Sequence, residues 1–426
     1  MSSETPLTLT DHRRNLVLNS LHEMFWGFGM AFHSTYAVIP LFLKGLGAPD
    51  IVIASVAGVF VISSATPQIV TAFLGQNIRN LKLAVVAVHG LPIPAIFLAG
   101  FIFAFLRPSG PSAWTIYYVC YLLFTLGLGI VFPIWADFLE TVHRPDRRGS
   151  FFGVSFAFNF LAGSIGGFTV KKLLASPIPF PANFGYGFLI YAGCILLASL
   201  LFIPYRTTTT VRKSEPKTFP QFIKEIRHLL ASDANFKRYL TSRILLTANY
   251  PAIPLYAAYS YDKLRFDMSE AGIFTAITVV VAGLWSYVTG RVGDRFGHKR
   301  AMVMVFSFYL LALVTAILAE TLAQTYLIFV FLGMAQGGFW TSAMSLIYEF
   351  AGKRDKKIYF ALVDSLTAPF VLFFIILSGI LIPLVGVPTV LKGIGLFLIL
   401  GVLSLAFRTK EPRIVQREFP PPESIP

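Results

Sequence analysis

The sequence predicts an all-α integral membrane protein with twelve transmembrane helices in two pseudo-symmetric halves of six. Of the 426 residues, 55% are hydrophobic and only 13% are charged, whereas a soluble domain carries about 25% charged residues. Apolar runs of about twenty residues recur along the chain, each long enough to cross a hydrocarbon core as a helix. The runs are continuous and do not alternate, so they indicate helices and not the strands of a barrel.

The predicted spans cover residues 17–42, 51–74, 83–106, 114–140, 149–173, 184–204, 240–261, 269–290, 300–319, 324–350, 357–382 and 386–407. The first begins after the polar residues Thr10 and Asp11, and no small-residue cleavage site follows it, so we expect a retained helix. Cys120 and Cys194 both lie within spans, which favours neither a disulfide nor a metal site. We therefore expect no metal and no cofactor.

The spans divide into an N-terminal half (residues 1–204) and a C-terminal half (240–408), with a cytosolic linker over 205–239 and a tail over 409–426. Apolar residues recur at helical spacing over 219–230, which predicts an amphipathic helix on the membrane surface; a solvated tether is the alternative. An internal repeat supports the two halves. A shift of 209 residues places Glu140 on Glu349, and the charged residues 144–148 on 353–357.

The net charge of +14 follows the membrane topology. With the N-terminus in the cytosol, 27 of the 35 Lys and Arg residues fall in the tails and even-numbered loops, against seven on the opposite side. This positive-inside bias predicts a multi-pass protein of the inner (plasma) membrane with both termini in the cytosol. The basic residues then indicate contact with anionic membrane lipids and not with nucleic acid. No phosphate-cradle or nucleophile–base pattern indicates an enzyme.

Residues 290–300, GRVGDRFGHKR, form a basic, glycine-punctuated turn between two apolar spans. This turn resembles the loop signature of the major facilitator superfamily of secondary transporters, and the resemblance covers residues 15 to 410. The N-terminal counterpart, GQNIRNLK (75–82), has Arg79 where the signature has an acid and lacks its second glycine. Segments 22–32, 135–153 and 235–246 are similar to a little-characterised bacterial branch. The resemblance implies alternating access around a central site near the midplane, lined by spans one, four, seven and ten.

Ionisable groups within spans are costly, so each carries a functional hypothesis. Buried carboxylates can exchange protons near neutrality, which suits Glu23 as the proton-coupling residue, with His22 beside it. A packing partner on a neighbouring helix is the alternative for Glu23. Asp137 and Asp364 are the reserve candidates.

The candidate substrate contacts are aromatic, amide and imidazole groups. His22, Trp26 and His33 share one face of span one, and Pro251 and Pro254 should break span seven. For His33, a hydrogen-bonded structural histidine is the alternative. The midplane holds few charges, which favours a neutral, cationic or amphipathic organic solute. The substrate-binding candidates are Trp26, His33, Asn249, Tyr250, Gln336 and Trp340.

The superfamily resemblance also implies a cytosolic gate, because acids that end the fourth helix of each half pair with arginines of the glycine turns in some branches. Asp294 would cap a helix or steady its own turn, and topology-determining charge without pairing is the alternative. The implied pairs join Glu140 to Arg291 or Arg295 and to Arg147 or Arg148, and Glu349 to Arg79 and to Lys356 or Lys357.

Span five carries AGSIGG (162–167), which resembles the glycine-proline motif of proton-coupled antiporters, with Gly163 in the proline position. Close helix packing is the alternative. We therefore expect a proton-coupled secondary transporter of a small organic solute, with export slightly favoured, working as a monomer. Uniport or symport uptake of a neutral metabolite, and a transporter-like membrane scaffold or lipid translocase, remain open.

Overall fold

The computed structural model describes residues 7–75, 78, 80–144, 147–208, 230, 233–352 and 356–414, and all regular structure in them is helical. Nine of the described helical runs are long and apolar enough to cross a membrane. They correspond to predicted spans two to six and eight to twelve, because the last run, Leu366–Ile414, holds two spans. Predicted spans one and seven are broken helices. The linker helix predicted over 219–230 lies outside the described residues, apart from Leu230.

Contacts divide the chain into two units. Unit 1 comprises Met1–Pro216 and Arg265–Val279, and unit 2 comprises Lys217–Leu264 and Val280–Pro426. The division at 216 falls within the predicted linker. Unlike the sequence-based division, it places the start of α12 (Glu270–Phe296) with unit 1. The physical reason is close backbone contact, since a Cβ on Gly272 would lie 2.3 Å from the amide nitrogen of Lys171.

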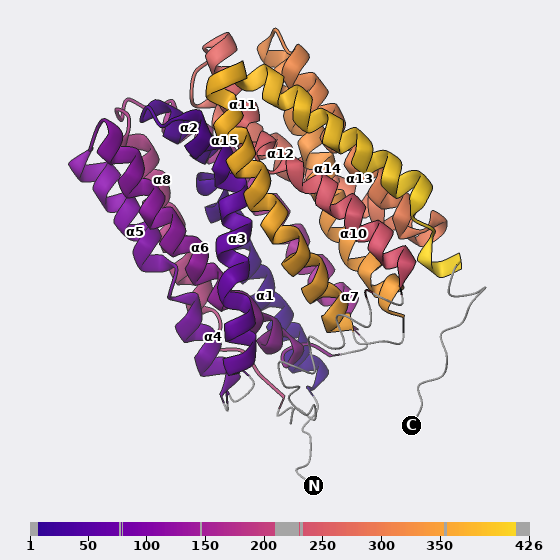
Figure 1. Cartoon of the computed structure of the whole chain (residues 1–426). Coiled ribbons are helices and arrows are strands. Elements are labelled where there is room, and N and C mark those ends of the chain that lie inside the picture. The colour runs from indigo at the N-terminus through magenta and orange to yellow at the C-terminus, as the bar shows by residue number, and fades with distance from the viewer. Residues whose placement is uncertain are drawn as a thin grey trace. The chain divides into compact units, whose positions relative to one another are not determined.

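Unit 1 is a bundle in which α1 packs most extensively against α7, α3 against α6, and α5 against α8 (Figure 1). Its helices are α1 (Leu9–Met30), η1 (Ala31–His33), α2 (Val38–Gly45), α3 (Asp50–Gly75), α4 (Leu81–His89), α5 (Ile93–Phe101), η2 (Ile102–Leu106), α6 (Pro111–Glu140), α7 (Arg148–Leu174) and α8 (Ala182–Leu200).

The first helix begins at Leu9, earlier than the predicted start at residue 17. Thr8 forms a capping box with Asp11, in which the Asp11 amide donates to Thr8 Oγ1 at 3.1 Å. The cap extends the helix through a polar stretch that an apolar window does not detect. At the other end the chain leaves the helix after His33, and Ser34 Oγ accepts from the amide of Val38 at 3.0 Å to start α2.

Glycines bring α1 and α7 into backbone contact. A Cβ on Gly27 would lie 2.1 Å from the Asn159 carbonyl oxygen, and a Cβ on Gly166 would lie 2.6 Å from that of Phe28. Small residues allow such close helix approach in membranes. The AGSIGG segment therefore has a packing role in this structure, which favours the packing alternative for that motif.

Polar side chains tie together one end of unit 1, here called the inner end. Asn15 Nδ2 donates to the carbonyl oxygens of Val142 at 2.8 Å and Arg206 at 2.7 Å, and Asn15 Oδ1 accepts from the Arg206 amide at 3.0 Å. The Arg144 amide donates to His12 Nδ1 at 3.2 Å. These bonds join the start of α1 to the segments that follow α6 and α8. We predict that this end faces the cytosol.

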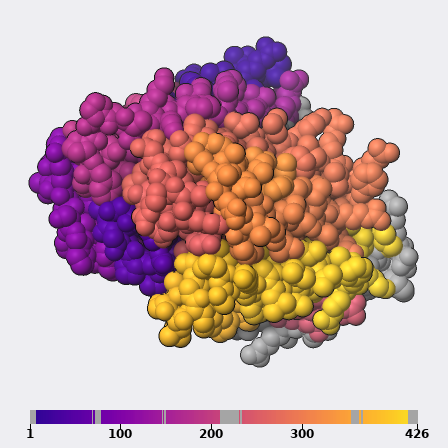
Figure 2. Space-filling view, turned by 90° about the horizontal axis from the view of Figure 1, so that it is seen from above, coloured from indigo at the N-terminus to yellow at the C-terminus, as the bar shows by residue number. Residues whose placement is uncertain are grey.

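Unit 2 contains the remainder of α12 and α10 (Ala234–Leu246), η4 (Thr247–Asn249), α11 (Ala252–Leu264), α13 (His298–Leu318), α14 (Leu322–Ala351), α15 (Lys356–Leu403) and η5 (Ser404–Arg408). The predicted break in span seven lies at η4 and Pro251, as the two prolines indicate. Helices α13 and α14 pack side by side. The long α15 reverses direction at Gly386, where φ is +78° (Figure 1). Its last part forms a continuous band on the surface seen in Figure 2.

The backbone contact at Gly27 gives a test by substitution. Gly27→Ala should lower the free energy of unfolding by about 1–3 kcal/mol, because a Cβ there meets backbone that cannot turn away. The measurement is the thermal unfolding of the purified protein in detergent. Gly153→Ala on α7 is the matched control, since no atom lies within 4 Å of its Cβ position. Gly153→Ala should leave the free energy of unfolding unchanged or raise it slightly. Equal effects of the two variants would contradict the contact.

Candidate functional site

A buried polar cluster surrounds Glu23 in unit 1. Glu23 is only 5% exposed. Its Oε2 accepts from Asn159 Nδ2 of α7 at 2.9 Å, and its Oε1 lies 3.4 Å from His22 Nδ1. The close approach of α1 and α7 at Gly27 brings Asn159 within reach. Among the described residues, no Lys or Arg lies within ion-pair distance of Glu23.

The hydrogen bonds of His22 assign its tautomer. Trp26 Nε1 donates to His22 Nε2 at 3.0 Å, so in the neutral ring Nε2 is the acceptor and the proton is on Nδ1. That Nδ1–H faces Glu23 Oε1 without the alignment of a full hydrogen bond. His22 and Glu23 are therefore placed to exchange a proton.

Two further groups extend the cluster toward the inner end. His89 of α4 lies with its ring centroid 5.6 Å from that of His22, and its Nδ1 is 3.0 Å from the Val85 carbonyl oxygen. Tyr205 donates to Asn19 Oδ1 at 3.2 Å. Burial, and then the negative charge of Glu23, raise the pKa of Tyr205 well above its usual range, so the phenol stays a neutral donor. Sequence reasoning did not include these residues.

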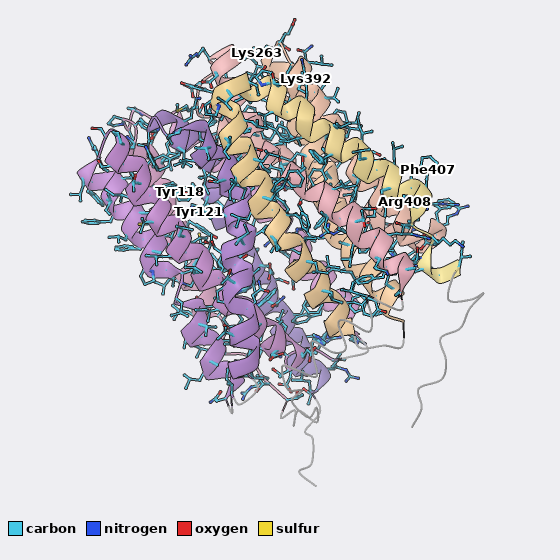
Figure 3. The ribbon with its side chains drawn as sticks, viewed as in Figure 1. Tyr118, Tyr121, Lys263, Lys392, Phe407 and Arg408 are labelled. Carbon is cyan, nitrogen blue, oxygen red and sulfur yellow. The ribbon has the colours of Figure 1, made fainter. Side chains whose placement is uncertain are left out.

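His33 lies in a separate aromatic cluster. Its Nε2 is 2.9 Å from Tyr117 Oη, and its ring lies 5.7 Å from that of Tyr121, which Figure 3 labels. Tyr191 of α8 separates the two clusters, with ring centroids 6.1 Å from Trp26 and 5.5 Å from His33. This environment inside unit 1 favours the structural alternative for His33, whereas Trp26, His22 and Glu23 lie together as their spacing predicts.

The substrate candidates of unit 2 are differently exposed. Asn249 is buried and accepts from Tyr256 Oη at 3.3 Å. Tyr250 and Gln336 are half-buried. Trp340 is 71% exposed, with its ring edge-on to that of Phe339 at 6.1 Å.

Arg243 also belongs to this part of unit 2, and the sequence analysis did not include it among the candidates. Its guanidinium lies 4.4 Å from the centroid of the Phe339 ring. Its Nε is buried and has no hydrogen-bond partner among the described residues. Arg243 can therefore offer a donor to an acceptor oxygen beside an aromatic face.

The gate residues of unit 2 contact the C-terminal segment. Arg413 Nε lies 2.5 Å from Glu349 Oε1, and Arg413 Nη1 donates to the Asp294 carbonyl oxygen at 3.0 Å. His298 Nε2 is 3.6 Å from Asp294 Oδ1 and 3.9 Å from Glu349 Oε1. Arg413 is a partner of Glu349 that the sequence analysis did not predict.

The remaining gate and coupling candidates contact aromatic rings, are exposed or half-buried, or lie outside the described residues. Arg291 and Arg295 lie over the rings of Tyr287 and Phe296 at 5.0 and 5.1 Å. Glu140 and Arg147 are exposed, and Asp137 is half-buried in α6. The side chains of Arg148, Lys356 and Asp364, and all of Arg79, lie outside the described residues. The pairs predicted between the units therefore stay predictions.

At the end of unit 1 opposite Asn15, here called the outer end, α12 is bonded to its neighbours. Lys171 of α7 forms an ion pair with Glu270 of α12. The hydroxyls of Ser34 and Thr275 are 2.9 Å apart. A Cβ on Gly167 would lie 2.7 Å from the Ala276 amide nitrogen. These contacts hold the first turns of α12 on α7.

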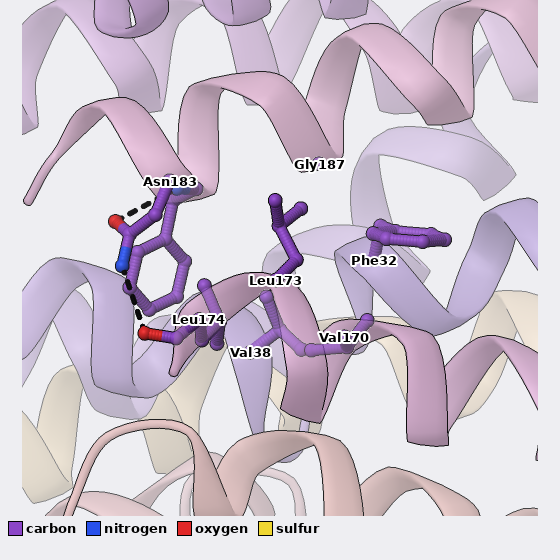
Figure 4. A pocket seen from close by; sticks show the side chains of 8 residues that line it. Phe32, Val38, Val170, Leu173, Leu174, Asn183 and Gly187 are labelled. Atoms are coloured by element: carbon purple, nitrogen blue, oxygen red, sulfur yellow. Dashed lines mark hydrogen bonds between the residues drawn. The ribbon is translucent and has the colours of Figure 1, made fainter. Parts of the chain in front are cut away.

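A small pocket at the outer end of unit 1 is too small for a solute. Phe32, Val38, Leu173 and other mainly apolar residues line it, and Asn183 points across it to the Leu174 carbonyl oxygen (Figure 4). Its volume is about 10 Å³, which is room for about one water.

The comparisons with known proteins agree on the fold. The sequence profile of the Major Facilitator Superfamily matches residues 4–167 and 239–424. No curated protein shows significant sequence similarity to the chain. A mutant of the nucleoside transporter NupG superposes with a TM-score of 0.70 at 12% identity, over 94% of this chain and 100% of that chain.

Two further structures are similar in the same way. A bacterial homologue of the human lysosomal transporter Spinster, inward-facing and unoccupied, has a TM-score of 0.65 at 13% identity, over 97% of this chain and 98% of that chain. A D-xylose-proton symporter has a TM-score of 0.67 at 13% identity, over 94% of this chain and 99% of that chain. At these identities, the likeness shows the fold alone.

The bond from Trp26 to His22 gives a spectroscopic prediction. His22→Leu removes the acceptor of the Trp26 N–H, so it should change the tryptophan fluorescence of the purified protein. Most of this change should be lost in a Trp26→Phe background, and it should persist in a Trp340→Phe background, since Trp340 is exposed. The measurement is the emission spectrum of each purified variant and its parent. An undiminished change in the Trp26→Phe background would contradict the bond.

Proposed function

This chain belongs to the major facilitator superfamily and is a membrane transporter, and we propose that it is a proton-coupled secondary transporter of a small organic solute, with export ahead of import. The observation that carries the proposal is Glu23. It is a buried carboxylate within a membrane helix, held by a neutral amide and an imidazole with no cation of the described residues beside it. Ionisable groups within membrane helices typically serve proton relays or ion pathways.

The geometry supports a proton relay through His22. A proton that reaches Nε2 displaces the Trp26 N–H, and the Nδ1 proton can then pass to Glu23 Oε1. The ring is left neutral with its proton on Nε2. Oε2 remains bonded to Asn159 throughout, so Oε1 is the atom that gains and loses the proton. Asp137 and Asp364 are the reserve candidates.

Trp26, Asn249, Tyr250, Gln336 and Trp340 remain the proposed solute contacts. Arg243 narrows the expected chemistry. A free guanidinium donor beside Phe339 disfavours a cation and favours a neutral or amphipathic solute that carries acceptor oxygens. Uptake of a neutral metabolite by symport is the second candidate, and the similar D-xylose-proton symporter has this activity by its name.

Alternating access requires the first turns of α12 to separate from α7 at the outer end. Lys171–Glu270 and Ser34–Thr275 oppose that separation, so they act as the outer gate in our proposal. We propose that the inner end faces the cytosol, as the distribution of Lys and Arg predicts, and that the protein works as a monomer in the plasma membrane. Glu140 with Arg291 or Arg295 would then close the cytosolic side.

The proton-coupling prediction is tested on Glu23→Gln. The solute is first identified by thermal shift against a metabolite and drug panel, since a ligand at 100 times its Kd stabilises the fold by about 2.7 kcal/mol. Glu23→Gln should keep this stabilisation but lose pH-gradient-driven transport in proteoliposomes, because an amide cannot load a proton. The sign of the pH change inside the vesicles separates export by exchange from symport.

Glu320→Gln is the matched control for Glu23→Gln. Glu320 is exposed, and the same loss of a negative charge there should leave transport unchanged. If Glu23→Gln transports at the wild-type rate under the same gradient, the proton is carried elsewhere.

The outer-gate prediction is tested on Lys171 and Glu270. Either Gln substitution should lengthen the distance between spin labels at Ser176 and Met268, because it removes an ion pair that holds α12 on α7. The exchange Lys171→Glu with Glu270→Lys should restore the shorter distance. Since the pair is part-exposed, the expected coupling energy is only about 0.2–1 kcal/mol.

The matched control for the outer gate is the ion pair of Lys44 and Asp50, whose Nζ and Oδ1 atoms are 3.1 Å apart. It joins α2 to α3 in the same unit. Lys44→Gln should leave the spin-label distance unchanged. Lengthening by Lys44→Gln equal to that by Lys171→Gln would show general loosening and would exclude a specific gate.

A further inference from the structure

A pocket of about 420 Å³ opens in unit 2 where the C-terminal segment meets the start of α13. We propose that it binds the phosphate headgroup of an anionic phospholipid. The pocket is lined by two residues of α13 and five of the segment that follows α15: Lys299, Arg300, Phe407, Thr409, Lys410, Glu411 and Ile414.

The charge of the lining suits a phosphate. Lys299, Arg300 and Lys410 supply three cations, and Arg300 adds the planar fork that matches phosphate oxygens. Glu411 is the one acid in the lining. Its Oε2 lies 2.1 Å from where a Cβ on Gly297 would be, so the carboxylate is turned toward the glycine turn. Glu411 also interacts electrostatically with Lys299, so it offsets part of the positive charge, and three cations against one carboxylate leave the lining with a net positive charge.

Both walls of the pocket are held in place before any ligand binds. The Lys410 amide donates to Asn235 Oδ1 at 2.8 Å, and Asn235 Nδ2 donates to the Lys410 carbonyl oxygen at 3.0 Å. Lys299 Nζ donates to the Ala406 carbonyl oxygen at 2.7 Å, which leaves it two further protons to donate. Fixed walls reduce the entropy lost on binding.

Thr409 points most directly to a ligand. It is only 2% exposed, and its Oγ1 has no hydrogen-bond partner among the described residues. A buried hydroxyl without a partner is unfavourable. A phosphate oxygen in the pocket would accept from it, together with the neighbouring ammonium and guanidinium groups.

The surroundings favour a lipid over a soluble phosphate ester. Phe407 is 81% exposed and Ile414 is 54% exposed, and both line the pocket at the end of the last apolar run. Figure 3 shows Phe407 and Arg408 at one end of unit 2, with Lys263 and Lys392 at the opposite end. Exposed apolar side chains beside cations at the end of a span lie where acyl chains meet headgroups.

The test is binding of short-chain phosphatidylglycerol to the purified full-length protein in detergent, followed by thermal shift. Arg300→Gln and Lys410→Gln should each weaken binding about fivefold. Thr409→Val should weaken it about tenfold, because the hydroxyl then cannot donate to a charged oxygen. Glu411→Gln should strengthen binding, since it removes the one negative charge. Lys392→Gln is the matched control at the opposite end and should leave binding unchanged.

Phosphatidylcholine of the same chain length and glycerol phosphate distinguish the possible ligands. The proposal expects tight binding of phosphatidylglycerol alone. Equal binding of phosphatidylcholine would overturn the charge argument, and equal binding of glycerol phosphate would overturn the assignment to a lipid. If Lys392→Gln weakened the binding of phosphatidylglycerol as much as Lys410→Gln does, no defined pocket would be involved. Arg300 and Lys410 are exposed, so these variants should fold.

Discussion

The close contact between α1 and α7 is the constraint on which the candidate proton site depends. Gly27 has no side chain, so the backbone of Asn159 can approach α1. That approach brings the Asn159 amide to Glu23. Asn159 therefore both lies at the helix crossing and holds the Glu23 carboxylate. In a low-dielectric interior, an ionised carboxylate without such a donor would be strongly disfavoured. The geometry of the crossing thus decides which donor meets the Glu23 carboxylate.

The segment 290–300, predicted as a turn, is mostly helical, and only Gly297 lies between α12 and α13. The glycines of this glycine turn follow a similar steric rule. A Cβ on Gly293 would lie 2.2 Å from His298 Nδ1, and one on Gly297 would overlap the Glu411 carboxylate. The glycines of the signature thus make room for a histidine and for the C-terminal segment. Arg413 then joins that segment to Glu349 and to the turn. The turn and the segment after α15 form one polar assembly, which also forms the wall of the cationic pocket.

The helical class, the twelve spans and the superfamily could be predicted from the sequence and are confirmed by the fold and the comparisons. The grouping of His22, Glu23 and Trp26 follows from spacing along one helix. Asn159 could not be predicted, because 136 residues separate it from Glu23 and only tertiary packing joins them. Trp340 shares a helix face with Gln336, yet it is exposed, since spacing does not reveal which face of a largely apolar helix is covered.

The reversal of α15 at Gly386 bears on how the chain enters the membrane. Only one residue there departs from helical geometry, so the last two spans have no polar loop between them. Leu384 and Val385, beside the reversal, are apolar and exposed. An apolar tip crosses a bilayer far more easily than a charged loop does. The two spans can therefore insert together as a helical hairpin, because neither has a polar segment on the side of the reversal that would hold it alone across the membrane during synthesis.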